Sequence, residues 1–373
     1  MSLRATARVN LAAIERNVSR LRGGLAEGVQ LCAVVKADAY GHGAVPVARA
    51  ALRGGAARLA VAAAEEAAEL RAAGLDARLL IMGALSAEEL PTALAAGAEL
   101  TAWSDAFVDA VAASASQPVR MHVKLDTGMG RLGTRDAREA LGVAERIAAG
   151  APALELAGLM THFATADTDP EFLEHQLRSF EPLVAEFRRR WPGIAVHAAN
   201  SAATLRAPDS HFDFVRCGIA IYGCDPMNDD PALRGLEPAL ELRSYVAAVK
   251  RARAGESVGY GRRFVAERET WIATLPIGYG DGVRRALTNN CDVIVDGRRY
   301  PLVGTVSMDN ITIDLGAEAA ARVGQLATVI GRDGDQVQTA EDLANRIGTI
   351  NYEIVCGISR RVPRAYHRDG EPA

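Results

Sequence analysis

The chain contains very little lysine. Only three of its 42 basic residues are lysines, at positions 36, 124 and 250, and all the others are arginines. Arginine can solvate a surface or pair with a carboxylate or phosphate, but it cannot form a Schiff base and does not lose its proton in proteins. Each lysine kept in so arginine-rich a sequence is therefore either a candidate for amine chemistry or an ordinary residue without a special role.

Cysteine is also scarce, and the seven histidines are scattered. The five cysteines are odd in number and form no C-x-x-C pair, which argues against a disulfide framework or a zinc site. No H-x-H or H-E-x-x-H spacing occurs, so no metal centre is predicted. We expect the cysteines to be small buried side chains in a reducing cytoplasm. They stand at positions 32, 217, 224, 291 and 356.

Long apolar runs and a large net charge are absent as well. No apolar stretch approaches the roughly 18 residues of a transmembrane helix, so no membrane partner is expected. The N-terminal segment lacks the apolar core and cleavage site of a signal peptide, which predicts a cytoplasmic protein. A net charge of −4 and a pI near 6.0 give no general attraction to nucleic acid.

The composition is that of an ordinary globular protein, with 49% hydrophobic and 24% charged residues. At roughly 150 residues per domain, the length of 373 residues predicts two domains, or one large barrel with an addition. Over the first 235 residues, short apolar segments alternate with alanine-rich helical segments. The apolar segments expected to form strands are 31–36, 58–62, 78–82, 98–103, 119–126, 154–160, 194–200 and 212–218.

These segments are continuously hydrophobic, which indicates strands buried on both faces of a parallel sheet. Eight strand–helix units favour a (β/α)₈ barrel over an open doubly wound sheet, and no G-x-G-x-x-G motif follows the first strand. From residue 236 the pattern becomes β-branched, with a hairpin signal at Asp296-Gly297. The sequence therefore predicts an α/β fold: a TIM-like barrel over residues 1–235 and a mostly-β domain over residues 236–373.

Polar and titratable residues collect where the expected barrel strands end. Chemistry in such barrels lies at the carboxyl ends of the strands, whereas a buried lysine or arginine is costly unless it is paired. Each residue taken alone is explained by a structural salt bridge, but their common position at one rim favours a functional site. The residues are Lys36, Lys124, Asp126, Arg131, His162, Asn200, Ser201 and Arg216.

Lys36 is the most informative of them, because desolvation in a barrel mouth lowers the pKa of an amine and makes it a candidate Schiff-base former. Its segment, VVKADAYGHG, resembles the cofactor-lysine motif of the alanine racemases, which use pyridoxal 5′-phosphate. That family has a cofactor-binding barrel followed by a β-rich domain. Further segments resemble the family in the same order: KLDTGMGRLG, THFATAD, HAANSAA, VRCGIAIYG, VGYGRR, PIGYGDG, GTVSMDN and RRVPR.

The resemblance implies a two-base mechanism in a homodimer. Lys36 would hold the cofactor as an internal aldimine and then act as one base, and Tyr260 of VGYGRR would be the second base, on the other face of the substrate. Tyr260 lies in the C-terminal domain, which in this family reaches the active site of the other subunit. A free tyrosine has a pKa near 10, so a neighbouring cation must stabilise its phenolate or the proton transfer. By resemblance, His162 and Arg216 have this role. Without the motif, Tyr260 would be read as a turn aromatic.

The resemblance also assigns the cofactor contacts. Arg216 would face the pyridine nitrogen and keep it unprotonated, because an arginine stays charged. The phosphate would be held by hydroxyls, backbone N–H groups and a helix start, where Ser201 could equally be only a helix N-cap. Many family members carry a tyrosine where this chain has Arg360. The cofactor-binding residues implied are Lys36, Tyr40, Asn200, Ser201, Arg216, Gly218, Ile219 and Arg360.

Lys124 matches a lysine that is often carbamylated in this family. Its new carboxylate would orient Arg131 toward the cofactor and the substrate carboxylate. An unmodified Lys124 would be an unfavourable like charge beside Arg131 unless Asp126 intervenes. Met308 and Tyr279 match residues that reach the substrate across the dimer, whereas Lys250 matches no catalytic position and is expected at the surface.

The function implied is interconversion of L- and D-alanine, which supplies D-alanine for cell-wall peptidoglycan. Arg360 leaves a broader alanine and serine racemase open. A non-catalytic pyridoxal-phosphate-handling barrel and a decarboxylase of the same cofactor class are further alternatives. The second domain argues against the non-catalytic barrel. The segments DTGMGRLG and RCGIAIYG favour a racemase over the decarboxylase.

Overall fold

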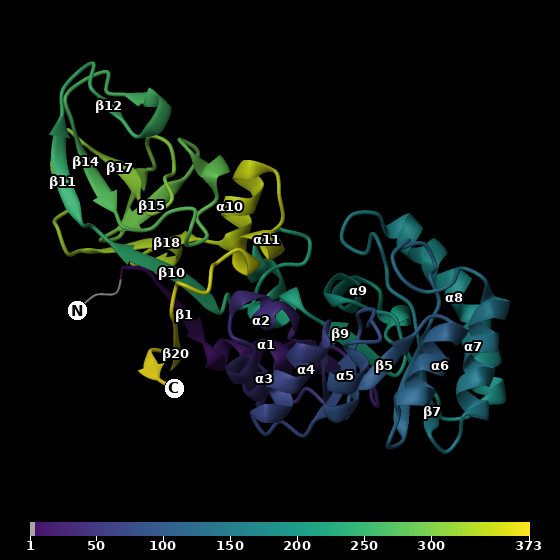
Figure 1. Ribbon diagram of the computed structural model, residues 1–373. Coiled ribbons are helices and arrows are strands. Elements are labelled where there is room, and N and C mark those ends of the chain that lie inside the picture. The colour runs from purple at the N-terminus through teal and green to yellow at the C-terminus, as the bar shows by residue number, and fades with distance from the viewer. Residues whose placement is uncertain (1–3) are drawn as a thin grey trace. The chain divides into compact units, whose positions relative to one another are not determined.

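The computed structural model describes residues 4–373, and these residues form two compact units (Figure 1). The barrel unit contains residues 14–39 and 44–221. The β unit contains residues 40–43, residues 222–373 and the described residues up to 13. We expected residues 1–235 in the barrel domain, but residues 222–235 and the strand at residues 6–10 lie in the β unit. That strand belongs to the β unit because it pairs with two later strands of the unit.

The barrel unit is built on a ring of eight parallel strands, in the order β8-β7-β6-β5-β4-β3-β2-β9. The ring is nearly closed, because hydrogen bonds from Asp213 N to Val196 O (3.0 Å) and from Arg216 N to Ala199 O (2.9 Å) connect its two ends. The predicted parallel barrel is thus confirmed. Its strands are β2 (Gln30–Val34), β3 (Arg58–Val61), β4 (Arg78–Ile81), β5 (Glu99–Ala102), β6 (Val119–Lys124), β7 (Leu154–Met160), β8 (Ala195–His197) and β9 (Phe214–Cys217).

Helices surround the strands of this unit (Figure 1). Several begin at side chains that cap the first free N–H groups: Ser104, Asp136 and Asp169 accept hydrogen bonds from N–H groups one or two residues inside α6, α7 and α8. The helices are α1 (Leu11–Gly23), α2 (Lys36–Gly41), α3 (Ala44–Arg53), α4 (Ala64–Ala72), α5 (Leu90–Ala95), α6 (Asp105–Ser114), α7 (Ala137–Ala149), α8 (Pro170–Arg190) and α9 (Ser201–Arg206), with 3₁₀ turns η1 (Pro208–Ser210) and η2 (Ile219–Tyr222).

The β unit contains one large sheet and two smaller ones. The large sheet runs β16-β15-β18-β10-β1-β20-β21, with β19 paired to β18; β11-β14-β17 and β12-β13 form the others. Its strands are β1 (Thr6–Asn10), β10 (Leu240–Tyr245), β11 (Ala248–Ala252), β12 (Ser257–Val258), β13 (Phe264–Val265), β14 (Thr270–Leu275), β15 (Asp292–Val295), β16 (Arg298–Pro301), β17 (Ile311–Gly316), β18 (Leu326–Asp333), β19 (Gln336–Gln338), β20 (Arg364–Arg368) and β21 (Glu371–Pro372).

The predicted hairpin at Asp296-Gly297 joins β15 to β16, and both residues have the positive φ angles, 52° and 69°, that a tight hairpin turn requires. Two helices and three 3₁₀ turns complete the β unit: α10 (Ala340–Ile347), α11 (Asn351–Cys356), η3 (Pro231–Arg234), η4 (Tyr260–Arg262) and η5 (Arg285–Leu287).

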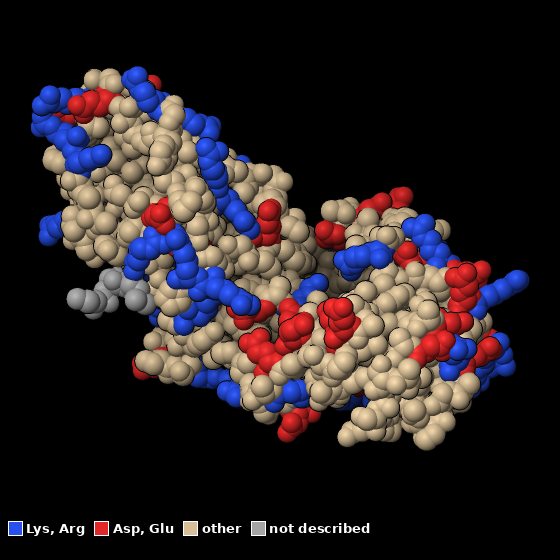
Figure 2. Space-filling model, in the orientation of Figure 1, with Lys and Arg blue, Asp and Glu red and all other residues tan. Residues whose placement is uncertain are grey.

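Charged side chains of both signs are interspersed over the barrel unit in Figure 2. None of the helices in residues 4–373 is long and apolar enough to cross a membrane. The same residues contain no group of three His, Cys, Asp or Glu side chains placed to hold a metal ion. None of the five cysteines forms a disulfide within residues 4–373; four are buried as expected, whereas Cys356 is exposed.

Candidate active site

The barrel unit brings a cluster of basic side chains together at the carboxyl ends of its strands. Lys36 follows β2, Lys124 ends β6, His162 follows β7 and Arg216 lies on β9. Burial holds the pKa of His162 well below its usual value, and the nearby charges of Arg216, Lys124, Arg131 and Lys36 lower it further. His162 is therefore neutral at physiological pH, and the cluster around it suits a ligand that carries negative charge.

Arg216 is the most deeply buried cation of this cluster, with 2% of its surface exposed. Its Nη1 donates to His197 Nδ1 at 2.6 Å, and its Nη2 lies 2.8 Å from the carbonyl oxygens of Thr161 and Ala198 and 3.2 Å from His162 Nδ1. Burial lowers the pKa of the guanidinium to about 10, so it remains charged at neutral pH. Its Nε is buried without a hydrogen-bond partner, which leaves one donor for a bound acceptor.

Lys124 is also buried, with 4% exposure. Burial, followed by the charges of Arg216 and Arg131, lowers the pKa of its amine to about 8. With that pKa, about a tenth of the amine is neutral at pH 7. Lys124 is therefore mostly charged at pH 7 but has a small neutral fraction, which the arginines around it lack.

Asp126 stabilises the loop after β6. Its carboxylate accepts from the N–H groups of Gly128 (3.1 Å) and Gly130 (3.0 Å) and forms an ion pair with Arg135 at 3.2 Å. Asp126 does raise the pKa of Lys124, but its direct partners are the loop backbone and Arg135. Asp126 thus mainly shapes the turn before Arg131, whose own side chain is exposed.

The turn that follows Lys36 is a left-handed helix, which the sequence did not predict. Ala37, Asp38, Ala39 and Tyr40 all have φ angles between 52° and 54°. Left-handed helical residues cost roughly 1–2 kcal/mol each when they carry a side chain, so the surroundings must enforce the turn.

Two carboxylates stabilise this strained turn. Glu66 accepts a hydrogen bond from Ala37 N–H at 2.6 Å while it also binds the N–H groups of Ala62 and Ala63. Asp38 accepts from Ala44 N–H at 2.8 Å. Sequence analysis missed Glu66, because a glutamate in an alanine-rich helix gives no local sign that it reaches the residue after Lys36.

The residues expected to bind phosphate lie at the ends of β8 and β9. Asn200, not Ser201, caps α9, because its side chain accepts from Ala203 N–H at 3.0 Å. The Ser201 hydroxyl instead accepts from the N–H groups of Gly218 (2.9 Å) and Ala220 (3.4 Å). The structure therefore brings Ser201 and Gly218 together, with Ile219 next in the chain.

The other predicted site residues belong to the β unit. Tyr260, Met308 and Tyr279 are exposed at 74%, 52% and 43%. Their loops lie beside one another: Tyr279 N–H donates to Ser307 O at 2.9 Å, Gly280 N–H to Met308 O at 2.9 Å, and the Thr305 hydroxyl to Tyr260 O at 2.6 Å. Lys250 is exposed on β11.

Tyr40 is buried in the β unit, with its ring 4.9 Å from that of Tyr222, whereas Arg360 is exposed. The neighbour of Arg360, Arg361, was not singled out from the sequence. Its guanidinium lies 2.7 Å from carboxylate oxygens of both Asp281 and Asp309 and so links the loops that carry Tyr279 and Met308.

Comparison with known proteins places almost the whole chain in one group. Residues 9–226 match the family described as alanine racemase, N-terminal domain, and residues 239–366 match alanine racemase, C-terminal domain. An alanine racemase of Geobacillus stearothermophilus is 42% identical over 370 residues, which cover 97% of this chain and 93% of the relative. One of Nostoc is 40% identical over 373 residues, covering 97% and 96%.

Solved structures that superimpose on this chain include alanine racemases as well. The alanine racemase of a D-cycloserine-producing Streptomyces lavendulae superimposes with a TM-score of 0.94 at 39% identity, over 98% of each chain. That of Bacillus anthracis, with bound L-Ala-P, gives a TM-score of 0.91 at 39% identity, over 100% of this chain and 97% of the other.

Proposed function

The chain belongs to the alanine racemase family, and from this premise we propose that it interconverts L- and D-alanine with pyridoxal 5′-phosphate held by Lys36. The observation that carries the proposal is the cluster of Lys36, Lys124, Arg131 and Arg216 around a neutral His162. An anionic cofactor and a carboxylate substrate would neutralise these charges.

The residues present fit this cofactor. Lys36 supplies the amine, and the partnerless Nε of Arg216 supplies a donor for the pyridine nitrogen. Because the guanidinium remains charged at neutral pH, that nitrogen would stay unprotonated. Phosphate oxygens would be bound by the Ser201 hydroxyl and neighbouring backbone N–H groups. The full set proposed for the cofactor is Lys36, Tyr40, Asn200, Ser201, Arg216, Gly218, Ile219 and Arg360.

Racemisation requires a proton to leave one face of Cα and to return on the other. When bound, the cofactor withdraws electrons from Cα and so makes that proton removable. The Lys36 amine and the Tyr260 phenol would serve the two faces, each taking up or returning the proton at its own Nζ or Oη. His162 and Arg216 would assist Tyr260 as neighbouring donors.

Arg131 would bind the substrate carboxylate, and Lys124 would orient Arg131. A carbamate on Lys124 would place a carboxylate near Arg131, and the lowered pKa of the amine supports that modification. A residual positive charge on Lys124 would instead repel Arg131. Tyr279 and Met308 would complete the substrate pocket.

We also propose that the enzyme is a cytoplasmic homodimer that supplies D-alanine for peptidoglycan. The exposed Tyr260, Tyr279 and Met308 support a dimer in which the β unit of one subunit completes the site of the other. Arg360, in place of the tyrosine found in many family members, keeps serine as a second candidate substrate.

A racemisation assay tests the proposal. The purified protein, supplied with pyridoxal 5′-phosphate, is incubated with L-alanine, D-alanine or L-serine, and the enantiomer ratio is followed by chiral chromatography. We expect a yellow protein that brings either alanine enantiomer to an equal mixture. A yellow protein without activity would favour a cofactor-handling role, and a colourless inactive protein would overturn the cofactor assignment.

A further inference from the structure

Arg216 is a buried cation without a carboxylate partner. Within residues 4–373, its polar contacts are two carbonyl oxygens and the two histidines His162 and His197, and no ion pair reaches it. A buried charge is costly unless it is paired and hydrogen-bonded. The nearest compensating charge therefore has to be found beyond these contacts.

That charge lies at the end of a hydrogen-bonded chain through the barrel interior. Arg216 Nη1 lies 2.6 Å from His197 Nδ1, His197 Nε2 lies 3.0 Å from His122 Nδ1, and His122 Nε2 lies 2.8 Å from Glu99 Oε2. Both histidines are 0% exposed and Glu99 is 4% exposed. The chain connects β9, β8, β6 and β5, and Glu99 is the first residue of β5, at the end of the barrel opposite the basic cluster.

The donor at one end and the acceptor at the other fix every proton between them. A guanidinium can only donate and a carboxylate can only accept, so both histidines must accept at Nδ1 and donate from Nε2. Burial lowers the pKa of both His197 and His122, which keeps the two rings neutral. Each hydrogen bond therefore points from Arg216 toward Glu99.

Packing fixes the two rings. His197 stacks on Phe214 with ring centres 4.1 Å apart, and His122 meets His197 edge-on at 5.0 Å. Gly158 provides the space for His122, because a Cβ at this position would lie 2.0 Å from His122 Nδ1. Neither ring can turn over without displacing the barrel core.

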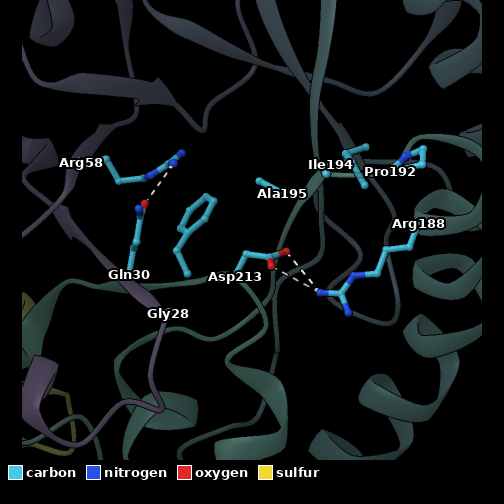
Figure 3. Close-up of a pocket in the computed structure, with 10 residues that line it drawn as sticks. Gly28, Gln30, Arg58, Arg188, Pro192, Ile194, Ala195 and Asp213 are labelled. Carbon is cyan, nitrogen blue, oxygen red and sulfur yellow. Dashed lines mark hydrogen bonds and ion pairs between the residues drawn. The ribbon is translucent and has the colours of Figure 1, made fainter.

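Glu99 is kept charged by a group of arginines at the start of the strands. Its carboxylate lies 2.7 Å from Arg78, 3.3 Å from Arg120 and 3.6 Å from Arg58. Burial alone would raise its pKa, but the contacts with His122 and Arg78 hold that pKa at about 2. Arg58 is itself held by Gln30, as Figure 3 shows.

We propose that Glu99 is a positioning residue for the racemisation site, acting on Arg216 through His122 and His197. The chain would hold Nη1 in one direction, so that the partnerless Nε stays aimed at the bound cofactor. This role rests on the proposed function, because only that function provides a cofactor for Arg216 to contact. The rival explanation is that the four residues only fill and neutralise the barrel core.

The first test needs no variant. Ring ¹⁵N chemical shifts of the histidines are recorded for the wild-type enzyme between about pH 5 and 8, the range in which an ordinary histidine changes charge. We expect His122 and His197 to remain neutral with the proton on Nε2 throughout. A proton on Nδ1 of either ring would break this series of hydrogen bonds and overturn the proposal.

The second test compares Glu99→Gln with Asp213→Asn. Asp213 is a matched control at the same end of the barrel. It pairs with Arg188 (Figure 3) and accepts from Val196 N–H, but it takes no part in the hydrogen bonds that connect Arg216 to Glu99. We expect Glu99→Gln to move the His197 ring signals and to lower kcat on the order of tenfold with little change in KM, as for other residues that orient a functional group through a hydrogen bond. Glu99→Asp, which keeps the charge, should recover part of kcat.

Asp213→Asn should leave the His197 signals in place and kcat within about twofold of wild type, even if both variants lose similar thermal stability. Unchanged His197 signals in Glu99→Gln, or an equal loss of kcat in Asp213→Asn, would overturn the positioning role. Failure of the wild type to racemise alanine would instead overturn the proposed function. The histidine signals would still decide whether the hydrogen bonds run from Arg216 to Glu99 as described.

Discussion

Lys36 and Lys124 differ from the arginines around them in one chemical respect: their amines can lose a proton and form a new covalent bond. The structure places both in the basic cluster, whereas Lys250 is exposed on β11. Substitution by arginine keeps the positive charge and removes only the amine, and is therefore the sharpest probe of each lysine.

We predict that Lys36→Arg lowers racemisation by a factor on the order of 10³ or more and removes the absorbance of the bound cofactor, because a guanidinium can neither form the bond nor act as a base. Chiral chromatography and an absorbance spectrum of the purified protein measure the two effects. Lys250→Arg is the matched control and should retain full activity. Comparable activity in Lys36→Arg would exclude Lys36 as the anchor.

We predict that Lys124 takes up carbon dioxide more readily as the pH rises from 7 to 8. Carbamylation requires the neutral amine, whose fraction increases from about a tenth to about a half over this range for a pKa of about 8. A ¹³C signal from labelled bicarbonate should grow accordingly and be absent in Lys124→Arg, with reduced activity. A fully active Lys124→Arg enzyme would contradict this role.

At the residue scale, the sequence places Lys36, Lys124, His162 and Arg216 at the ends of strands, and this position predicted that their side chains would gather at one rim. The ligand that they bind remains a prediction. His122 and Glu99 could not be identified in this way. Each lies within an apolar strand segment, and only the three-dimensional closure of the barrel brings Glu99, His122 and His197 into line.

At the scale of elements, the left-handed turn α2 is the least predictable part of the fold. The eight barrel strands followed from their apolar runs, and the hairpin from Asp296-Gly297. Nothing in KADAY indicates four consecutive positive φ angles, since alanine favours right-handed helices. The conformation is stabilised in part by the distant carboxylate of Glu66, which local sequence does not reveal.

We predict that Ala37→Gly stabilises the enzyme by up to about 1 kcal/mol, because Ala37 is exposed with a φ of 52° and glycine adopts this conformation without the Cβ penalty. Thermal unfolding measures the change. Ala112→Gly, at an exposed position of the right-handed α6, is the matched control and should destabilise by about 1 kcal/mol. Equal destabilisation by both substitutions would argue against strain in α2.

At the scale of the whole molecule, we propose that the active site combines residues from two chains. Lys36 belongs to the barrel unit and Tyr260 to the β unit. In a two-fold symmetric dimer, each site would combine Lys36 of one subunit with Tyr260 of its partner. A subunit damaged at one of these positions can then still complete one site of a mixed dimer.

We therefore predict that mixing inactive Lys36→Ala and Tyr260→Phe proteins restores activity. Random exchange makes about half of the dimers mixed, and each mixed dimer has one intact site, so about a quarter of wild-type activity should return. The mixture is assayed after mild dissociation and reassembly, with each variant treated alone as the control. A reassembled mixed dimer without activity would show that both bases come from the same chain.

The pairing of β1 with β20 determines when the large sheet of the β unit can be completed during synthesis of the chain. Residues 7–10 lie parallel to residues 364–367 in the large sheet of the β unit. During synthesis at 5–20 residues per second, β1 leaves the ribosome roughly 20 seconds to more than a minute before this partner strand exists. The barrel strands have all been made by then. Both edges of β1 are unpaired until β10 is made, and one edge stays unpaired until β20 follows. Completion of the large sheet is accordingly among the last events of folding in the cell, and a nascent chain stopped before β20 would expose β1 to aggregation.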